Sequence, residues 1–239
     1  MTSKKVLYED GSKKIIESDN SDQLILSFTD TISTPNGSKQ TKIKGRGAIN
    51  NAISCHLFDY LESYNISTYF ISKSHENEMT VKNVEMLPFE VVVSNVATGE
   101  LCKKLKVKEG NELQAPFIEY AYKNDNNNRE IIDEIALLQL NITTTEDINN
   151  LSMLVLKINA LLKSFLERRK IKLVDCLLQF GKHRGHYILG GELSPDTCRM
   201  WASNSEEKMG EDRFLQDLGK IEEGYQEIHN RIFGGDDSQ

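Results

Sequence analysis

The stretch Lys172–Trp201, KLVDCLLQFGKHRGHYILGGELSPDTCRMW, decides the fold. It begins with an apolar run, KLVDCLLQF, that carries two polar residues, Asp175 and Gln179. A basic segment, Gly181–Gly185, separates this run from a second apolar run, His186–Leu189. Two apolar runs joined by a short glycine-containing segment are typical of a β-hairpin. We therefore predict a hairpin with a five-residue connection.

Polar residues gather directly after this hairpin. Gly190 and Gly191 allow the backbone to turn sharply, and Glu192–Asp196 then brings polar side chains to the hairpin's end. Arg199 follows, and Trp201, the only tryptophan of the chain, comes shortly after it. Polar groups that converge at a strand end can bind an anionic ligand. They can equally form an ordinary polar loop, and the residues alone leave both interpretations open.

The composition is that of a soluble globular protein. The chain has 239 residues, 38% hydrophobic and 27% charged, which is enough for one large domain or two small ones. Its 29 Lys and Arg against 36 Asp and Glu give a net charge of −7, so we expect no nucleic-acid partner. The 4 cysteines show no C-x-x-C spacing, and we find neither a signal peptide nor an apolar run of transmembrane length. We expect a cytoplasmic protein with free thiols and no membrane association.

The rest of the chain combines short apolar strands with amphipathic helices. The expected strands are Lys13–Glu17, Leu24–Phe28, Thr68–Ser72, Met79–Val84 and Glu90–Val96. The expected helices are Ala48–Tyr64, Glu146–Arg169 and Glu211–Ile232. Thr31–Lys44 and Tyr120–Ile131 are expected to be polar loops. Because strands come first and helices dominate later, we predict an α+β fold.

Three segments carry motifs of a known family. LVDCLLQFG followed by LGGELSPDTCRMW is similar to LVDFKLEFG and L.DE.SPD..RLW. Gly45–Asn51, GRGAINN, matches GKGxxNN and precedes an expected helix, whose N-terminal amides attract anions. Glu90–Lys104 matches EVVVRN.AAGSL.KR without a gap. The chain thus resembles the SAICAR synthetase (phosphoribosylaminoimidazole-succinocarboxamide synthase) family over nearly its full length.

The resemblance implies a fold and a reaction. The α+β fold would have a β-rich N-terminal lobe, residues 1–86, over a larger α/β lobe, residues 87–233, with a nucleotide cleft between them and a disordered tail at 234–239. The family joins L-aspartate to carboxyaminoimidazole ribonucleotide in de novo purine synthesis, using ATP, through an acyl-phosphate. The expected ligands are therefore ATP, Mg²⁺, the aminoimidazole ribotide and L-aspartate, and the expected assembly is a homodimer.

The candidate site residues are the positions that match the family. The nucleotide-binding candidates are Lys13, Val81, Lys82, Met86 and Lys123. The substrate-binding candidates are Arg46, Lys103, Ser194, Asp196, Arg199 and Asp212. Glu90 and Asp175 are the catalytic candidates, and Glu192 is the candidate metal ligand.

At other aligned positions this chain has a residue of different charge from that of the family. Lysine is replaced by Gly11 and Leu177, arginine by Ser94 and Leu215, and acidic residues by Gln179, Gly191 and Arg129, while Glu100 stands for a serine. Each charge-assisted hydrogen bond lost costs about 1.5–3 kcal/mol. The two substitutions Gln179 and Gly191 also argue against a metal site.

These departures leave three hypotheses open. The chain is a SAICAR-synthetase-like ligase, or a catalytically impaired or inactive relative that binds a nucleotide or a protein partner, or a ligase with a smaller and less anionic substrate. Nearby cations, Lys14, Lys44 and the segment Lys182–Arg184, are available to compensate for the lost charges.

Overall fold

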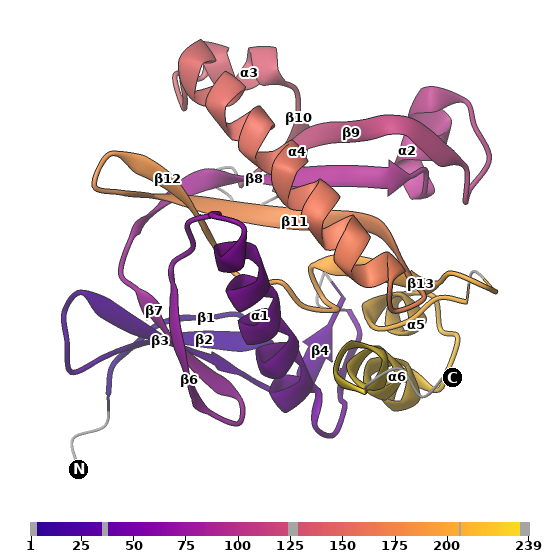
Figure 1. The fold of residues 1–239 in the computed structure, drawn as a ribbon, viewed down its shortest axis with the longest axis horizontal. Helices are drawn as coiled ribbons and strands as arrows, with labels where there is room; N and C mark the ends of the chain where they lie inside the picture. Colours follow the sequence, from indigo (N-terminus) through magenta and orange to yellow (C-terminus); the bar gives the residue numbers. More distant parts are fainter. Residues whose placement is uncertain (1–3, 35–37, 124–128, 206, 235–239) are drawn as a thin grey trace.

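Two large antiparallel sheets and a small two-stranded one form the β-structure of the protein (Figure 1). The computed structural model describes residues 4–34, 38–123, 129–205 and 207–234. The strands are β1 (Val6–Glu9), β2 (Lys13–Glu17), β3 (Gln23–Phe28), β4 (Thr31–Ser33), β5 (Gln40–Lys42), β6 (Phe70–His75), β7 (Glu78–Lys82), β8 (Glu85–Val96), β9 (Glu112–Lys123), β10 (Arg129–Ile132), β11 (Ile171–His183), β12 (His186–Gly190) and β13 (Cys198–Ala202). The helices are α1 (Arg46–Ser63), α2 (Gly99–Leu105), α3 (Glu134–Gln139), α4 (Thr145–Glu167), α5 (Glu211–Leu215) and α6 (Ile221–Phe233). The predicted α+β fold class is confirmed.

The first sheet has the strand order β1-β2-β3-β7-β6, and α1 packs against it. The inner face of α1 carries Ile53, Leu57, Phe58 and Leu61, whose side chains are fully buried. These residues form one core with apolar residues of β3 and β7. Burial of each side chain of this size stabilises the fold by about 1.5–3 kcal/mol, so this interface holds α1 in place on the sheet.

The second sheet has the strand order β10-β9-β8-β11-β12, and β13 pairs with β11. α4 lies across it in Figure 1. Asn95 on β8 and Asn159 on α4 exchange two amide hydrogen bonds of 2.9 Å, so this buried polar pair is fully satisfied and fixes the helix on the sheet. Thr144 caps α4, because its Oγ1 accepts from the amide of Asp147 at 3.1 Å.

The hairpin β11–β12 forms as predicted, but its connection is shorter than predicted. Strand pairing continues through His183, so only Arg184 and Gly185 form the turn. Their φ angles of 53° and 80° suit the right-handed twist of a two-residue hairpin. Gly181 is a residue of β11. The position requires glycine, because a Cβ there would lie 2.8 Å from the side chain of Val84. The predicted five-residue connection is therefore wrong: this glycine permits close packing and does not begin a turn.

The predicted helix Glu211–Ile232 is also wrong as a single element. It is divided into α5 and α6, because Asp217, Gly219 and Lys220 have left-handed φ angles of 54°, 67° and 48°. The break leaves the short α5 beside β13, where its side chains reach the pocket described below.

The predicted loops are shorter than expected. Thr31–Lys44 contains the hairpin β4–β5. Within Tyr120–Ile131, residues 120–123 end β9 and residues 129–131 belong to β10, while residues 124–128 lie outside the described part of the chain. The same holds for residues 235–239 of the expected tail. Among the described residues, no helix has both the length and the hydropathy that a membrane crossing needs.

Candidate functional site

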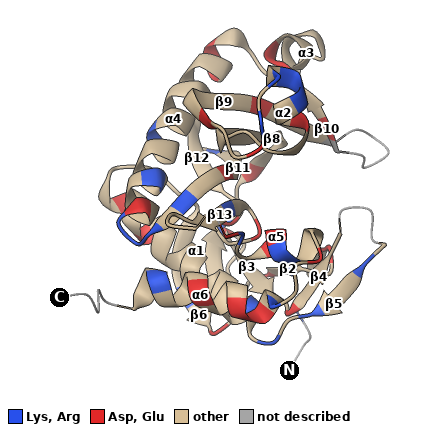
Figure 2. Ribbon diagram, turned by 90° about the vertical axis from the view of Figure 1, so that its right-hand side faces the viewer, with Lys and Arg blue, Asp and Glu red and all other residues tan. Residues whose placement is uncertain are grey.

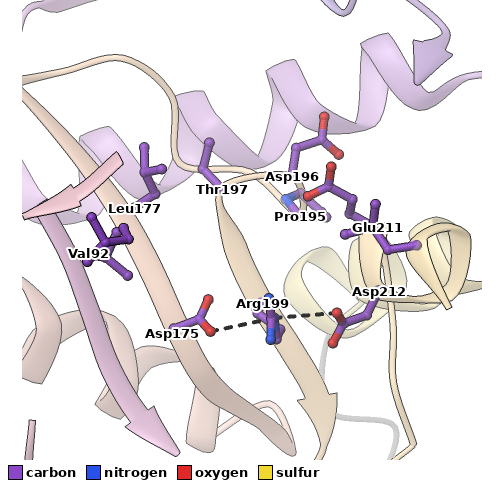
Figure 3. A pocket seen from close by; sticks show the side chains of 11 residues that line it. Val92, Asp175, Leu177, Pro195, Asp196, Thr197, Arg199, Glu211 and Asp212 are labelled. Carbon is purple, nitrogen blue, oxygen red and sulfur yellow. Dashed lines mark ion pairs between the residues drawn. The ribbon is translucent and has the colours of Figure 1, made fainter. Parts of the chain in front are cut away.

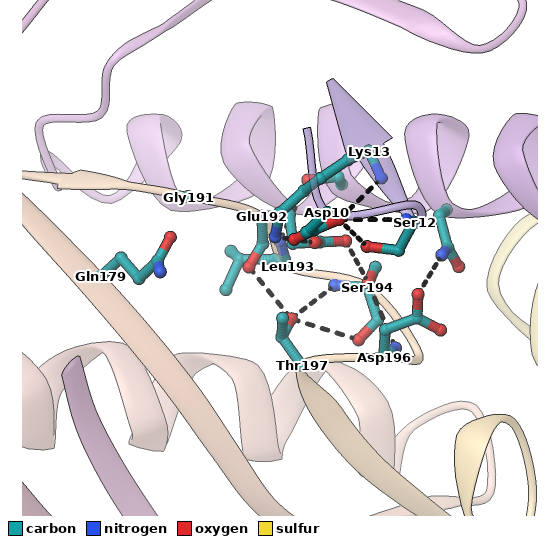
Figure 4. A network of polar contacts seen from close by, with 12 residues as sticks. Asp10, Ser12, Lys13, Gln179, Gly191, Glu192, Leu193, Ser194, Asp196 and Thr197 are labelled. Carbon is teal, nitrogen blue, oxygen red and sulfur yellow. Dashed lines mark hydrogen bonds and ion pairs between the residues drawn. The ribbon is translucent and has the colours of Figure 1, made fainter. Parts of the chain in front are cut away.

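A buried ion pair connects the first sheet to the loop that follows β12 (Figure 4). Lys13 Nζ lies 2.6 Å from Glu192 Oε1, and Ser194 Oγ donates to Glu192 Oε2 at 2.7 Å. Burial alone would raise the pKa of Glu192, but Lys13 outweighs it and holds this pKa below its usual value. Burial would likewise lower the pKa of Lys13, and Glu192 raises it instead. Lys13 and Glu192 are therefore both charged and neutralise each other.

The turn before β2 presents Lys13 and uses its own amides internally. Asp10 Oδ1 accepts from the amides of Ser12 at 3.0 Å and of Lys13 at 3.1 Å, and from Ser12 Oγ at 2.6 Å. The φ angle of Gly11, 85°, allows this tight turn. Because Asp10 takes the amides of Ser12 and Lys13, these two amides do not bind a phosphate in this arrangement, and the Lys13 side chain is the cation that the turn presents.

The start of α1 is likewise occupied by a carboxylate of the protein. Asp30 Oδ2 accepts from the amide of Gly45 at 3.2 Å, and Asp30 Oδ1 from the amide of Gly47 at 3.0 Å. These amides would otherwise attract an external anion. A Cβ on Gly47 would lie 2.9 Å from the carbonyl oxygen of Phe28, so the glycine is required by packing.

Asp196 is the centre of a second buried network. Its Oδ2 accepts from Arg46 and, at 2.7 Å, from Asn50 Nδ2, while its Oδ1 accepts from the hydroxyl of Tyr225. Arg46 is 2% exposed and also donates to the carbonyl oxygens of residues 29 and 31, at 2.8 and 2.9 Å. Burial raises the pKa of Asp196, and the repulsion by Glu192 adds to this, so that Arg46 offsets the rise only in part. The network joins α1, the β3–β4 connection, the loop after β12 and α6.

A cavity of about 490 Å³ lies beside this network (Figure 3). Its centre is Arg199 on β13, whose Nε lies 3.5 Å from Asp175 Oδ2 and 3.4 Å from Asp212 Oδ1. Arg199 NH1 donates to Thr98 Oγ1 at 2.7 Å, and Asp212 Oδ2 accepts from Trp201 Nε1 at 2.9 Å. The arginine is thus held in one orientation with two carboxylates around it.

The lining of this cavity is acidic and apolar. Among the described residues that line it, the charged groups are one cation, Arg199, and four carboxylates, Asp175, Asp196, Glu211 and Asp212. Figure 2 shows Asp and Glu beside Lys and Arg around β13 and α5. Burial, and next the repulsion by Asp196, raise the pKa of Glu211 to about 8. Among these described lining residues, carboxylates therefore outnumber the one guanidinium that could attract an anion.

Three of the positions that depart from the family motif in charge lie at or next to this cavity. Leu177 and Leu215, which stand where the motif has lysine and arginine, are lining residues. Ser94, at the other arginine position, is 6% exposed and pairs with Asp175 across the strands. Three positively charged side chains of the motif are thus replaced by neutral ones at one place.

The structure does not bring all candidate residues together. Lys103 lies on the exposed α2 and pairs with Glu100 at 2.6 Å. The Nζ of Lys82 donates to the carbonyl oxygen of residue 68 at 2.7 Å, and Val81 is 3% exposed in the core. Met86 is in contact with the hairpin, since a Cβ on Gly190 would lie 2.9 Å from its Cε. The side chain of Lys123 lies outside the described part. Their predicted ligand roles stay predictions.

Four residues of these networks were not predicted from the sequence, namely Asn50, Tyr225, Thr98 and Glu211. Tyr225 falls within the expected helix Glu211–Ile232, and its hydroxyl is a signal, because a buried tyrosine hydroxyl usually has a hydrogen-bond partner. Asn50 gave a weaker signal, as a polar residue of the GRGAINN motif. Nothing in the sequence pointed to Thr98, whose role depends on the approach of α2 to β13.

The residues near the candidate metal ligand do not fit a protein-held Mg²⁺. Both carboxylate oxygens of Glu192 are engaged, and Glu90 Oε1 accepts from Gln179 Nε2 at 2.6 Å. Gly191 supplies no side chain. The described residues contain no group of three or more His, Cys, Asp or Glu that could hold a metal ion.

Comparison with known proteins gives one consistent result. The family model of SAICAR synthetase matches residues 6–232. The phosphoribosylaminoimidazole-succinocarboxamide synthase of Clostridium novyi (strain NT) is 39% identical over 229 residues, which are 96% of this chain and 97% of the relative. The crystal structure of the synthase from Ehrlichia chaffeensis has a TM-score of 0.91 at 34% identity and covers 95% of this chain and 98% of that one. A SAICAR synthetase in complex with ADP has a TM-score of 0.90 at 38% identity and covers 95% and 97%. The chain therefore belongs to the SAICAR synthetase family.

Proposed function

We propose that this protein is an ATP-dependent ligase that joins L-aspartate to carboxyaminoimidazole ribonucleotide. The observation that carries the proposal is its membership of the SAICAR synthetase family over nearly the whole chain, with a fold in common with a relative in complex with ADP. Arg199 supports it, because a fixed guanidinium in a cavity of about 490 Å³ suits a carboxylate or phosphate of a small substrate.

On this proposal the nucleotide lies against the first sheet. Lys13 is the candidate for its phosphates, Val81 and Met86 are candidates for the adenine, and Lys82 and Lys123 are the remaining nucleotide-binding candidates. The division into a nucleotide-covering lobe, residues 1–86, and a larger lobe, residues 87–233, belongs to the same proposal. It is supported by the sheets, because the first contains strands up to Lys82 and the second begins with Glu85.

The substrates would occupy the cavity around Arg199. Ser194, Asp196 and Asp212 are the substrate-binding candidates there, and Lys103 would have to reach it from α2. The amine of L-aspartate must lose a proton before it can attack a carbonyl carbon. Besides the candidates Glu90 and Asp175, Glu211 can accept that proton, because its pKa of about 8 lies near the working pH.

The test is turnover by the purified protein with ATP, L-aspartate and carboxyaminoimidazole ribonucleotide in a magnesium buffer. ADP and the succinocarboxamide product should form together, and omission of any one of the three substrates should abolish both. Background ADP release that does not respond to the ribotide and aspartate, from folded protein, would contradict the proposal.

One observation favours a second candidate, a relative that has lost the reaction and still binds a nucleotide or a protein partner. The cavity has four carboxylates against one arginine, and that arginine is already paired with two of them. Removal of a single preorganised donor typically lowers a rate by about 10²–10³. ADP binding without turnover supports this candidate. Turnover only with an acceptor that carries no phosphate would support the third hypothesis, a ligase with a less anionic substrate.

Compartment and assembly complete the proposal. We place the protein in the cytoplasm, which its four free cysteines support. We further propose that it acts on small molecules as a homodimer. Light scattering at micromolar concentration tests the assembly, and a monomer mass would contradict it.

A further inference from the structure

Gln179 occupies the place between two neighbouring strands where the family motif has an acidic residue. On β11 it lies opposite Glu90 of β8 and Gly190 of β12. Its Nε2 donates to Glu90 Oε1 at 2.6 Å. A Cβ on Gly191 would lie only 2.4 Å from its Oε1. The amide side chain therefore fills the space from Glu90 to the backbone of Gly191.

Gln179 has room for its side chain because Gly191 has none, and neither residue carries a charge. The φ angle of Gly191 is 68°, which L side chains rarely adopt, and a real Cβ does not approach an oxygen to 2.4 Å. A side chain at position 191 would displace the amide oxygen of Gln179 from its present place. The two residues thus form a compact neutral pair in place of two acids.

The remaining carboxylates do not replace that acidic pair. Glu192 is bound by Lys13 through one oxygen and by Ser194 through the other, and its side chain is 4% exposed. Mg²⁺ requires near-octahedral oxygen ligands at about 2.0–2.1 Å and gives up its water reluctantly. Coordination by Glu192 would separate it from Lys13, and coordination by Glu90 Oε1 would displace Gln179.

We infer that this protein binds an adenine nucleotide with no divalent cation coordinated by its own side chains, so that Mg²⁺ adds little to the affinity. The inference rests on the proposed nucleotide binding. It follows from the contacts above, because Mg²⁺ that arrives on the phosphates gains no carboxylate from the protein. The same ion reduces the negative charge that Lys13 attracts.

Isothermal titration calorimetry with ADP, once with excess Mg²⁺ and once with EDTA, tests the inference. We expect the two dissociation constants to agree within about threefold. Affinity that is tenfold or more higher with Mg²⁺, a difference of about 1.4 kcal/mol, would overturn the inference and leave the proposed nucleotide binding intact. Absence of binding under both conditions would overturn both.

A second measurement requires no nucleotide. Gln179→Glu keeps the size of the side chain and places a second carboxylate against Glu90, so the melting temperature of this variant should rise when Mg²⁺ is added. The wild-type protein and the control Gln226→Glu, the same change on the exposed face of α6, should not respond. An equal rise for the wild-type protein would show a cation site and contradict the inference.

Discussion

Replacement of Arg46 by alanine should destabilise the protein by about 3–4 kcal/mol. Arg46 is the first residue of α1 and is almost fully buried. Its NH1 donates to the carbonyl oxygens of Thr29 and Thr31, and its NH2 pairs with Asp196. The alanine variant would leave both carbonyls and the carboxylate without this donor.

The magnitude follows from the burial of the pair. The side chains of Arg46 and Asp196 are 2% and 11% exposed, so solvent screens their attraction little. Removal of one partner of a buried ion pair costs about 3–5 kcal/mol. We take the lower part of this range, because Asn50 and Tyr225 continue to donate to Asp196. At about 2–4 °C per kcal/mol for a chain of this size, the melting temperature should fall by about 6–16 °C.

The assay is urea unfolding followed by the fluorescence of Trp201, which is buried in the folded protein. Arg168→Ala is the matched control, because Arg168 is exposed and bonds only to Ser164 and Tyr60 side chains. The free energy of unfolding of this control variant should fall by about 1 kcal/mol or less.

The pH dependence of the Arg46 variant gives a second reading. Below its raised pKa, Asp196 is protonated, so the uncompensated charge disappears and the loss of stability should shrink as the pH falls. If Arg46→Ala proves no more destabilising than Arg168→Ala, the structural role of Arg46 is refuted. A primary role in substrate binding would then be the better explanation.

Three further predictions can be checked with simple measurements. Glu211→Gln should raise the melting temperature at pH 8.5 and have little effect at pH 5. With its pKa raised to about 8, Glu211 is protonated in the folded protein at pH 5, and it becomes a buried charge that destabilises the fold as the pH rises through that pKa. An equal shift of the melting temperature at both pH values would contradict this. A thiol reagent should modify Cys102 rapidly in the native protein and the other three cysteines only after unfolding, since these three are buried; rapid modification of more than one thiol per chain would contradict this. Arg184→Gly should stabilise the protein by about 1 kcal/mol, because a left-handed φ is unfavourable for arginine, and unfolding in urea measures the change.

The sequence predicted those elements whose pattern is local. The helices around α1 and α4 and the strands near β2, β3, β6, β7, β8, β11 and β12 follow from hydrophobic periodicity, which is set by the residues themselves. The strands β1, β9, β10 and β13 of the two sheets were not predicted. The errors fall where packing decides. Gly181 was interpreted as part of a turn, yet its missing Cβ serves close contact with Val84. The break between α5 and α6 depends on left-handed φ angles at Asp217, Gly219 and Lys220, of which only the glycine is a strong sequence signal for such a conformation.

The sequence analysis singled out several residues of these networks but not the contacts between them. Lys13 and Glu192 are 179 positions apart, and Arg46 and Asp196 are 150 apart, so no local pattern links them. Their pairing becomes visible only when the loop after β12 meets the first sheet. The sequence likewise could not show that Leu177 and Leu215 line one cavity, which depends on the approach of α5 to β11.

These contacts change how the match to the family motif should be weighed. The matching charged residues Lys13, Arg46, Glu192 and Asp196 all have buried partners within the protein, so the stability of the fold is sufficient reason for their presence. Retention of these four therefore carries little information about turnover. The departures, in contrast, lie where a ligand would be: at the cavity around Arg199 and beside Glu90. We expect binding and turnover to depend on those positions, so ADP affinity with and without Mg²⁺ is a more informative measurement than any further comparison of motifs.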